Sequence, residues 1–331
     1  MLLKTPLQVK HLTLHNRLVL PPMASKTSTA DGQVTDAMLD YYRSICAGGY
    51  IGLVITEHAY IHMGGKAGPG QMSVAEDEMI GGLTCLADTV HSCGSKVICQ
   101  INHAGSGTNP NFTGGLQPIG PSAVGHPKKT ANVPREMTLE EIKAMPALFA
   151  AAARRAKAAG FDGVEIHACH GYLLNQFYSP LTNHRTDDYG GSLDNRLRLI
   201  CEVIRAVRSE VGADYPIALR LGGCDYTYGG STIDDAVYAC KVFAEEGVDL
   251  LDLSGGMCSF SVPGRAYAGF FSDMSEAVKA AVQVPVMLTG GVWSAANAEK
   301  LLQKGAADLI GVGRAQLRDH RWAEKALCEC R

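Results

Sequence analysis

Short runs of apolar residues alternate along the chain with longer segments of helical periodicity. Eight of these runs are rich in Leu, Ile and Val and alternate little with polar residues, which is typical of strands that are buried on both faces. They end at Met23, Glu57, Asn102, Ala168, Leu221, Ser254, Gly290 and Gly313. Because helical segments separate the runs, we expect parallel strands that are connected by helices.

The helical segments carry capping signals. Thr138 and Glu141 have the spacing of a capping box before an Ala-rich helix that ends near Gly160. Ser294 opens another predicted helix, which stops at Gly305. Eight strands with intervening helices predict a (β/α)8 TIM barrel. The alternative is a doubly wound open sheet, but that fold usually places a Gly-rich turn after its first strand, where this chain has "PPMAS".

Residues 103–137 interrupt this rhythm. The segment has no period and contains many Gly, Pro and Asn residues. Loops of this length in a compact domain are usually functional or disordered. This loop follows the third predicted strand, so in a barrel it lies on the C-terminal face, where active sites form. We expect a lid over the mouth of the barrel; an insertion without a role is the alternative.

Composition narrows the class of protein. The chain has 331 residues, a net charge of −3, 46% hydrophobic residues and 19% charged residues. These values are ordinary for a globular protein and do not indicate nucleic acid or a membrane surface as the main partner. The 11 cysteines follow no regular framework, and Lys4 and Pro6 come too early for a signal peptide. We therefore expect reduced thiols and a cytoplasmic location.

In a TIM barrel, residues at the C-terminal ends of the strands line the active site. This rule selects Pro22, Met23, Glu57, His58, Gln100, Asn102, His103, His167, His170, Tyr172 and Arg220. The last two strands end in "TGG" (289–291) and "GVGR" (311–314), and turns at these places commonly hold a phosphate. Backbone N–H groups of Gly291, Gly313 and Arg314 would be the donors. Tight turns between strand and helix are the alternative interpretation.

A phosphate site together with Gln100 and Arg220 suits flavin mononucleotide (FMN). The Gln100 amide offers a donor and an acceptor to a pyrimidine edge. Arg220 keeps its positive charge and could face the N1–O2 edge of a flavin, where negative charge builds on reduction. Each residue taken alone could instead be a satisfied polar side chain near the core of the barrel.

The segment "IHACHGYLLNQF" (166–177) gathers three hydrogen-bond donors, His167, His170 and Tyr172, just past a predicted strand. An anion hole, a carbonyl-binding site, a metal site with Cys169 and a pair of structural histidines are the alternatives. Further ligands at a spacing that suits a metal do not follow in the sequence. We therefore expect no metal.

Several motifs occur in the order that they have in the Old Yellow Enzyme family of FMN-dependent ene-reductases, which the chain resembles from about Leu3 to Asp319. They are "NRLVLPPM", "VITE", "CQINHAG", "IHACHGYLLNQFYSPLTNHRTDDYGGSLDNR", "ALRL" and "GVGRAQLRD". The resemblance implies a TIM barrel with an N-terminal hairpin and with FMN at its mouth. It also implies that residues 1–331 form a single domain.

The same resemblance implies roles for individual residues. FMN contacts are implied, some through backbone atoms only, for Pro22, Met23, Ala24, His58, Gln100, Arg220, Gly290, Gly291, Gly313 and Arg314. His167 and His170 match the pair that holds the substrate carbonyl, Tyr172 matches the proton donor, and Lys26 lies in the substrate wall. NADH or NADPH is the implied reductant.

The chain also departs from the pattern of the family. Many members carry Cys or Thr where this chain has Ala24, and some short members carry Tyr where it has Lys26, so the redox tuning and the substrate wall differ. Long members continue into an iron–sulfur segment and a nucleotide-binding domain, whereas this chain ends at "ALCECR". We expect direct electron transfer to the flavin from NAD(P)H or a partner protein. The roles of Cys328, Cys330 and Arg331 are left open.

We predict an ene-reductase that saturates C=C bonds conjugated to a carbonyl in a small-molecule substrate. Hydride transfer from reduced flavin to the β-carbon leaves an enolate-like oxygen, which two imidazole N–H groups can stabilise while a tyrosine protonates the α-carbon. The alternatives are a dehydrogenase that desaturates a cyclic ketone or steroid, an electron-transferring flavoprotein subunit, and a sugar- or phosphate-binding barrel without flavin. Assembly into a homo-oligomer is left open.

Overall fold

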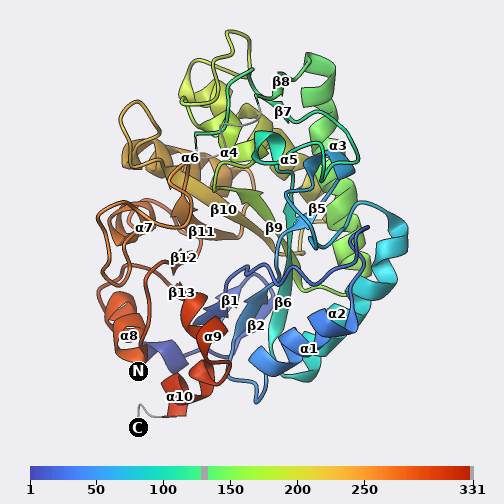
Figure 1. The fold of residues 1–331 in the computed structure, drawn as a ribbon. Coiled ribbons are helices and arrows are strands. Elements are labelled where there is room, and N and C mark those ends of the chain that lie inside the picture. The colour runs from blue at the N-terminus through green and yellow to red at the C-terminus, as the bar shows by residue number, and fades with distance from the viewer. Residues whose placement is uncertain (128–132, 329–331) are drawn as a thin grey trace.

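A ring of eight parallel strands forms the centre of the molecule in the computed structural model, which describes residues 1–127 and 133–328 (Figure 1). The strands are β3 (Leu18–Leu20), β4 (Leu53–Ile55), β6 (Lys96–Asn102), β9 (Gly163–Ala168), β10 (Ile217–Cys224), β11 (Leu250–Gly255), β12 (Val286–Thr289) and β13 (Leu309–Gly311). The ring closes because β4 pairs with both β3 and β6, and β13 pairs with β3. The predicted TIM barrel is confirmed, and an open sheet is excluded.

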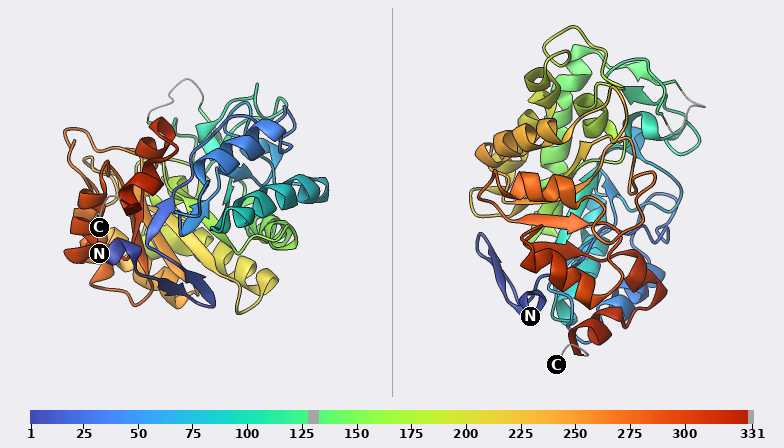
Figure 2. Two further views of the ribbon diagram at one scale, coloured as in Figure 1. Left: turned by 90° about the horizontal axis from the view of Figure 1, so that it is seen from below. Right: turned by 90° about the vertical axis from the view of Figure 1, so that its left-hand side faces the viewer.

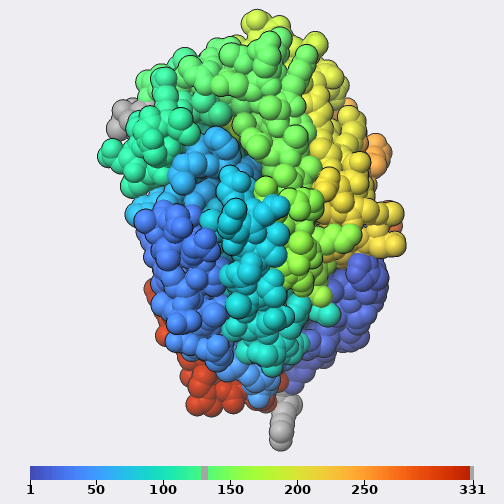
Figure 3. Space-filling model, turned by 90° about the vertical axis from the view of Figure 1, so that its right-hand side faces the viewer, coloured from blue at the N-terminus to red at the C-terminus, as the bar shows by residue number. Residues whose placement is uncertain are grey.

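Helices surround this ring (Figure 2). They are α1 (Asp36–Ile45), α2 (Ile80–Ser92), α3 (Leu139–Ala158), α4 (Leu173–Tyr178), α5 (Leu193–Val211), α6 (Ile233–Glu245), α7 (Ser272–Lys279), α8 (Ala295–Gln303), α9 (Arg314–Arg318) and α10 (Trp322–Cys328). Figure 3 shows α2 and α3 side by side on the outer surface. Among the described residues, no helix is long and apolar enough to cross a bilayer.

Both predicted helix caps are present. The Thr138 hydroxyl accepts a hydrogen bond from the Glu141 N–H, and the Glu141 carboxylate accepts one from the Thr138 N–H, which completes the capping box at the start of α3. Ser294 caps α8 by accepting from the Asn297 N–H. Each such cap is worth about 1 kcal/mol.

The N-terminal hairpin closes one end of the barrel. Strands β1 (Leu7–Val9) and β2 (Leu12–Leu14) pair antiparallel. Val9, Leu12 and Leu14 pack into an apolar cluster with Val19, Leu53, Ile55, Ile98, Ala218, Leu250, Met287 and Leu309. Fully burying one such side chain stabilises the fold by roughly 1.5–3 kcal/mol. The hairpin that the family resemblance implied is therefore present, and it fills the N-terminal end of the barrel.

The barrel interior becomes polar two residues beyond the apolar cluster, in the direction of the C-terminal ends of the strands. Gln100 lies two positions after Ile98 on β6, and Arg220 lies two positions after Ala218 on β10. Alternate residues of a strand point to the same face, so these polar side chains lie above the apolar plug. The change from apolar to polar inside the barrel positions the candidate site.

The described parts of the loop, 103–127 and 133–137, contact the segment that follows β9. They contain η4 (Gly105–Gly107), β7 (Ile119–Gly120) and β8 (Arg135–Glu136). The Ser106 N–H donates to Gln176 Oε1 at 3.1 Å, and the His184 N–H donates to Ser122 Oγ at 3.0 Å. These bonds anchor the loop beside the mouth of the barrel. Its action as a lid stays a prediction, and part of the loop, 128–132, lies outside the described residues.

Candidate active site

A cavity of about 320 Å³ opens at the C-terminal ends of the strands. Every residue with an implied FMN or catalytic role lines it: Pro22, Met23, Ala24, His58, Gln100, His167, His170, Tyr172, Arg220, Gly290, Gly291, Gly313 and Arg314. These residues come from positions far apart in the sequence. The structure brings them together because all parallel strands end at the same face of the barrel.

One side of the cavity is formed by glycine turns. Gly291 has a φ of 66°, and a Cβ there would lie 2.6 Å from the Tyr267 carbonyl oxygen. A Cβ on Gly313 would lie 2.6 Å from Met23 Sδ. The hydroxyl of Thr289 is buried and has no hydrogen-bond partner among the described residues. The backbone N–H groups of these glycine turns, the buried Thr289 hydroxyl and the Arg314 side chain are groups that suit a phosphate.

The floor of the cavity carries a buried polar network. Gln100 pairs in register with Glu165, and its Nε2 donates to Glu165 Oε1 at 2.7 Å. Arg220 pairs in register with Asp252, and its Nε lies 2.9 Å from Asp252 Oδ2. The distance is that of an ion pair, although the alignment is not that of a hydrogen bond. Arg220 is thus ion-paired with Asp252, and Glu165 is hydrogen-bonded to the Gln100 amide.

Burial raises the pKa of both carboxyl groups. The pKa of Glu165 rises to about 8, because the side chain is buried and Asp252 lies nearby, while Arg220 and the Gln100 amide act in the opposite direction. The pKa of Asp252 rises to about 6 through burial, against the attraction of Arg220. Both carboxyl groups are thus shifted toward their protonated forms, and Asp252 is the one at ion-pair distance from Arg220.

The two histidines lie on the wall above this network. Their ring centroids are 5.3 Å apart in an edge-to-face arrangement. His167 is buried, and its pKa is held well below the usual range by burial, by His170, by His58 and by Arg220. His170 Nε2 lies 2.7 Å from Ser254 Oγ. A neutral imidazole carries one N–H donor, so His167 can donate to an anionic oxygen without bringing its own charge.

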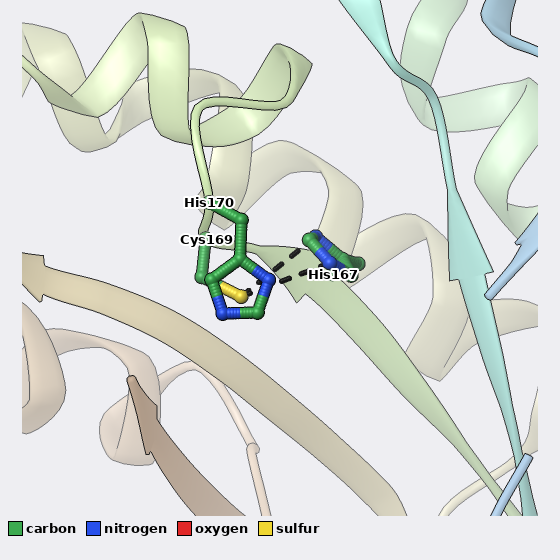
Figure 4. Close-up of side chains that lie close together, drawn as sticks. All are labelled: His167, Cys169 and His170. Carbon is green, nitrogen blue, oxygen red and sulfur yellow. Dashed lines mark hydrogen bonds between the residues drawn. The ribbon is translucent and has the colours of Figure 1, made fainter. Parts of the chain in front are cut away.

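A sulfur atom lies beside the same pair. Cys169 Sγ is 3.7 Å from His167 Nε2, and the possible ligand atoms of His167, Cys169 and His170 lie within 4.8 Å of one another (Figure 4). Burial raises the pKa of the Cys169 thiol well above its usual value. In this arrangement the thiol lies within hydrogen-bonding distance of both ring nitrogens of His167.

Tyr172 completes the wall. The residues before it, His170 and Gly171, have φ values of 58° and 72°, so the chain turns sharply before α4 begins. The Tyr172 ring lies 4.9 Å from the His167 ring and 5.6 Å from the His58 ring, measured between centroids. Burial, and then Cys169, raise its pKa to about 12. The phenol keeps its proton at neutral pH and is available as a donor.

Glu57, Asn102 and His103, which the strand-end rule selected, do not line this cavity, and neither does Lys26. Lys26 is the one of these four with an implied contact to substrate. It lines an adjacent pocket of about 250 Å³, which shares Ala24, His58 and Tyr172 with the main cavity. The contact between Lys26 and substrate stays a prediction, and the structure puts Lys26 in this neighbouring pocket. Lys26 lies one compartment away.

The sequence reasoning missed several residues of the site. Glu165 and Asp252 lie inside strands, and Ser254, Phe260 and Trp293 line the cavity. Ser254 ends a predicted strand, so the strand-end rule should have selected it. The two acids lie two residues before His167 and Ser254, and a period of two places them on the same inward face. No local signal marks Phe260 or Trp293.

Comparisons with known proteins agree with this geometry. Residues 3–329 match the NADH:flavin oxidoreductase / NADH oxidase family. The chain is 39% identical over 324 residues to an NADH oxidase of Thermoanaerobacter brockii, covering 96% of this chain and 50% of that protein. It is 37% identical over 322 residues to an NADPH dehydrogenase of Halalkalibacterium halodurans, covering 97% and 92%.

A solved structure shows the same fold. The Old Yellow Enzyme homologue from Zymomonas mobilis superposes with a TM-score of 0.86 at 27% identity, over 99% of this chain and 93% of that one. The chain spans half or less of some curated relatives. Family membership and the names of the relatives support FMN as the cofactor and NADH or NADPH as its reductant. The chain belongs to the NADH:flavin oxidoreductase / NADH oxidase family, which includes the Old Yellow Enzymes.

Proposed function

We propose that the chain is an ene-reductase that reduces C=C bonds conjugated to a carbonyl group. The observation that carries the proposal is the wall formed by His167, His170 and Tyr172 above a cavity that suits FMN. The reaction needs donors for the carbonyl oxygen and an acid for the α-carbon, and two adjacent imidazoles with a phenol beside them can supply both.

The residues of the cavity fit FMN. Gly291, Gly313 and Arg314 would hold its phosphate, and Gln100 and Arg220 would contact the polar edge of its ring. The remaining proposed contacts are Pro22, Met23, Ala24, His58 and Gly290. When bound and reduced, FMN supplies the hydride.

His167 and His170 would bind the carbonyl oxygen of the substrate. Negative charge grows on that oxygen as the β-carbon accepts hydride, and preorganised donors stabilise such charge by about 3 kcal/mol each. Nε2 of His170 is hydrogen-bonded to the Ser254 hydroxyl. If the serine donates there, the proton of a neutral His170 lies on Nδ1, where it can serve the substrate. Ser254 is thus a positioning residue.

Tyr172 would deliver the proton to the α-carbon. Its raised pKa keeps the phenol protonated at neutral pH, and a positioned general acid typically contributes 10²–10⁴-fold. The ring packs between His167 and His58, which fixes the hydroxyl relative to the carbonyl-binding point. Gly107 leaves room for it, since a Cβ there would lie 2.9 Å from the ring.

Rapid mixing of the two half-reactions tests the proposal. The purified protein should release FMN on denaturation, and NAD(P)H should reduce the bound flavin at the same rate in wild type and in Tyr172→Phe. Reoxidation by an enone should slow by about 10²–10⁴-fold in the variant. Tyr178→Phe, which changes a buried tyrosine bonded to the Gly223 carbonyl, is the control. Equal slowing of both half-reactions would assign Tyr172 to FMN binding or to the fold instead.

The same experiment separates the alternatives. Reduction by NAD(P)H alone, without a second protein, argues against an electron-transferring subunit. Faster turnover of a saturated cyclic ketone than of its enone would favour the dehydrogenase over the reductase.

A further inference from the structure

A second pocket adjoins the main cavity behind Tyr172. It has a volume of about 250 Å³ and is lined by Ala24, Lys26, Glu57, His58, Ala67, Gly68, Pro69, Gly70, Gln71, Phe112 and Tyr172. Three of these residues, Ala24, His58 and Tyr172, also line the main cavity. The two cavities are therefore neighbours around these three side chains.

The backbone around Lys26 is fixed. Lys26 has a φ of 60°, a conformation that costs roughly 1–2 kcal/mol in a non-glycine residue. Gly70 lies so close that a Cβ there would be 2.3 Å from the Lys26 carbonyl oxygen. The preceding Ser25 N–H donates to Glu57 Oε2 at 3.0 Å. The structure holds this turn by packing and by a buried acceptor, and Lys26 lines the pocket from it.

The charge of Lys26 has no protein counter-charge. Within residues 1–127 and 133–328, no carboxylate lies within ion-pair distance of its ammonium group. The acid in the pocket wall, Glu57, is buried, and burial raises its pKa despite the hydrogen bonds that it accepts. The Gln71 amide is occupied by the Ala67 N–H and by His58. The unpaired cation of the pocket is therefore Lys26.

We propose that Lys26 binds a carboxylate of the substrate, so that the enzyme prefers unsaturated carbonyl compounds that carry a second, anionic arm. This inference rests on the proposed function and adds the substrate class. The reacting C=C bond lies in the main cavity, and the carboxylate lies beyond Tyr172 beside Lys26. A charge-assisted hydrogen bond to the ammonium group of Lys26, which is exposed, favours the anionic ligand over its neutral analogue.

A matched ligand pair tests Lys26 without turnover. A saturated cyclic ketone with a carboxylate arm and its methyl ester are titrated into the FMN holoenzyme, and the shift of the flavin absorption gives both dissociation constants. The dissociation constant of the ester divided by that of the acid should fall about 10-fold in Lys26→Met and further in Lys26→Glu. We expect Lys26→Arg to restore most of this ratio. Lys241→Met, on the outer helix α6, is the control. Added salt should weaken the binding of the acid and leave the binding of the ester unchanged.

Turnover of the corresponding enone pair gives a second readout. If wild type reduces neither enone but the binding ratio still depends on residue 26, the proposed reaction is wrong and the anion subsite stands. If both enones are reduced and the ratio is the same in wild type, Lys26→Met and Lys26→Glu, the anion subsite is wrong and the reductase stands.

Discussion

Ser254 Oγ lies 2.7 Å from Nε2 of His170, so a residue at the end of β11 holds an imidazole that follows β9. The partner of one ring nitrogen determines which nitrogen carries the proton in a neutral histidine. A serine that donates to Nε2 would place the proton of a neutral His170 on Nδ1, the nitrogen proposed to face the substrate.

Ser254→Ala should weaken carbonyl binding without loss of FMN. The variant removes a hydrogen bond worth about 1 kcal/mol, so a para-substituted phenol that binds between the histidines should lose roughly 5-fold in affinity. Ser254→Thr, which keeps the hydroxyl, should retain most of the affinity. Titration of the phenolate-to-flavin charge-transfer band measures the effect. Equal affinity in Ser254→Ala and wild type would show that the serine does not position His170.

The double change His167→Ala and His170→Ala should abolish that charge-transfer band. The phenolate oxygen loses both donors, while the proposed contacts with FMN lie mostly elsewhere in the cavity. The flavin content of the variant, measured after denaturation, should stay near that of wild type. A band that survives in a variant with full flavin content would place the anion site elsewhere.

Glu165 should make the stability of the protein fall as pH rises. Its pKa in the folded chain is about 8, above the ~4.3 of an unfolded glutamate. The folded state binds more protons between these values, so the free energy of unfolding decreases from about pH 4.3 to pH 8. Asp252, with a pKa of about 6, contributes in the same direction.

The substitution Glu165→Gln removes the part of this pH dependence that comes from Glu165. Denaturant midpoints measured from pH 5 to pH 9 should fall less steeply in this variant than in wild type, whereas Glu210→Gln on the exposed end of α5 should follow wild type. Parallel curves for wild type and Glu165→Gln would mean that Glu165 is ionised throughout this range.

Gly291→Ala should weaken FMN binding more than Gly313→Ala does. Gly291 has a left-handed φ, and its added Cβ meets a backbone oxygen, whereas the Cβ on Gly313 meets the flexible end of Met23. Gly305→Ala is the matched control, because Gly305 has a φ of 76° with open space around it, far from the cavity. Fluorescence titration of the apoprotein with FMN gives the affinities. Equal losses in the Gly291 and Gly305 variants would assign the effect to backbone strain alone.

The ring of strands could be predicted because strands buried on both faces lose their polar alternation. The strand-end rule then found most of the cavity, since closing a parallel barrel brings its C-terminal ends together whatever the loops do. Ser254 satisfied that rule and was overlooked. Glu165 and Asp252 did not satisfy it, because they point inward from within their strands.

The positions of the remaining residues depend on tertiary contacts. Phe260 and Trp293 reach the cavity from loops, whose paths depend on packing with distant segments. Lys26 was placed in the substrate wall by resemblance alone. Its pocket is set by Gly70, which lies 44 positions further along the chain, and no pattern near Lys26 records that contact.

The apolar hairpin beneath the barrel has a kinetic consequence. Because Val9, Leu12 and Leu14 seal the N-terminal end, molecules enter and leave the cavity through its C-terminal mouth. The nicotinamide donor and the proposed unsaturated acceptor would then share this mouth and bind there one after the other. We expect ping-pong behaviour, with parallel lines in double-reciprocal plots, and inhibition by excess acceptor, which competes with the donor for the oxidised enzyme.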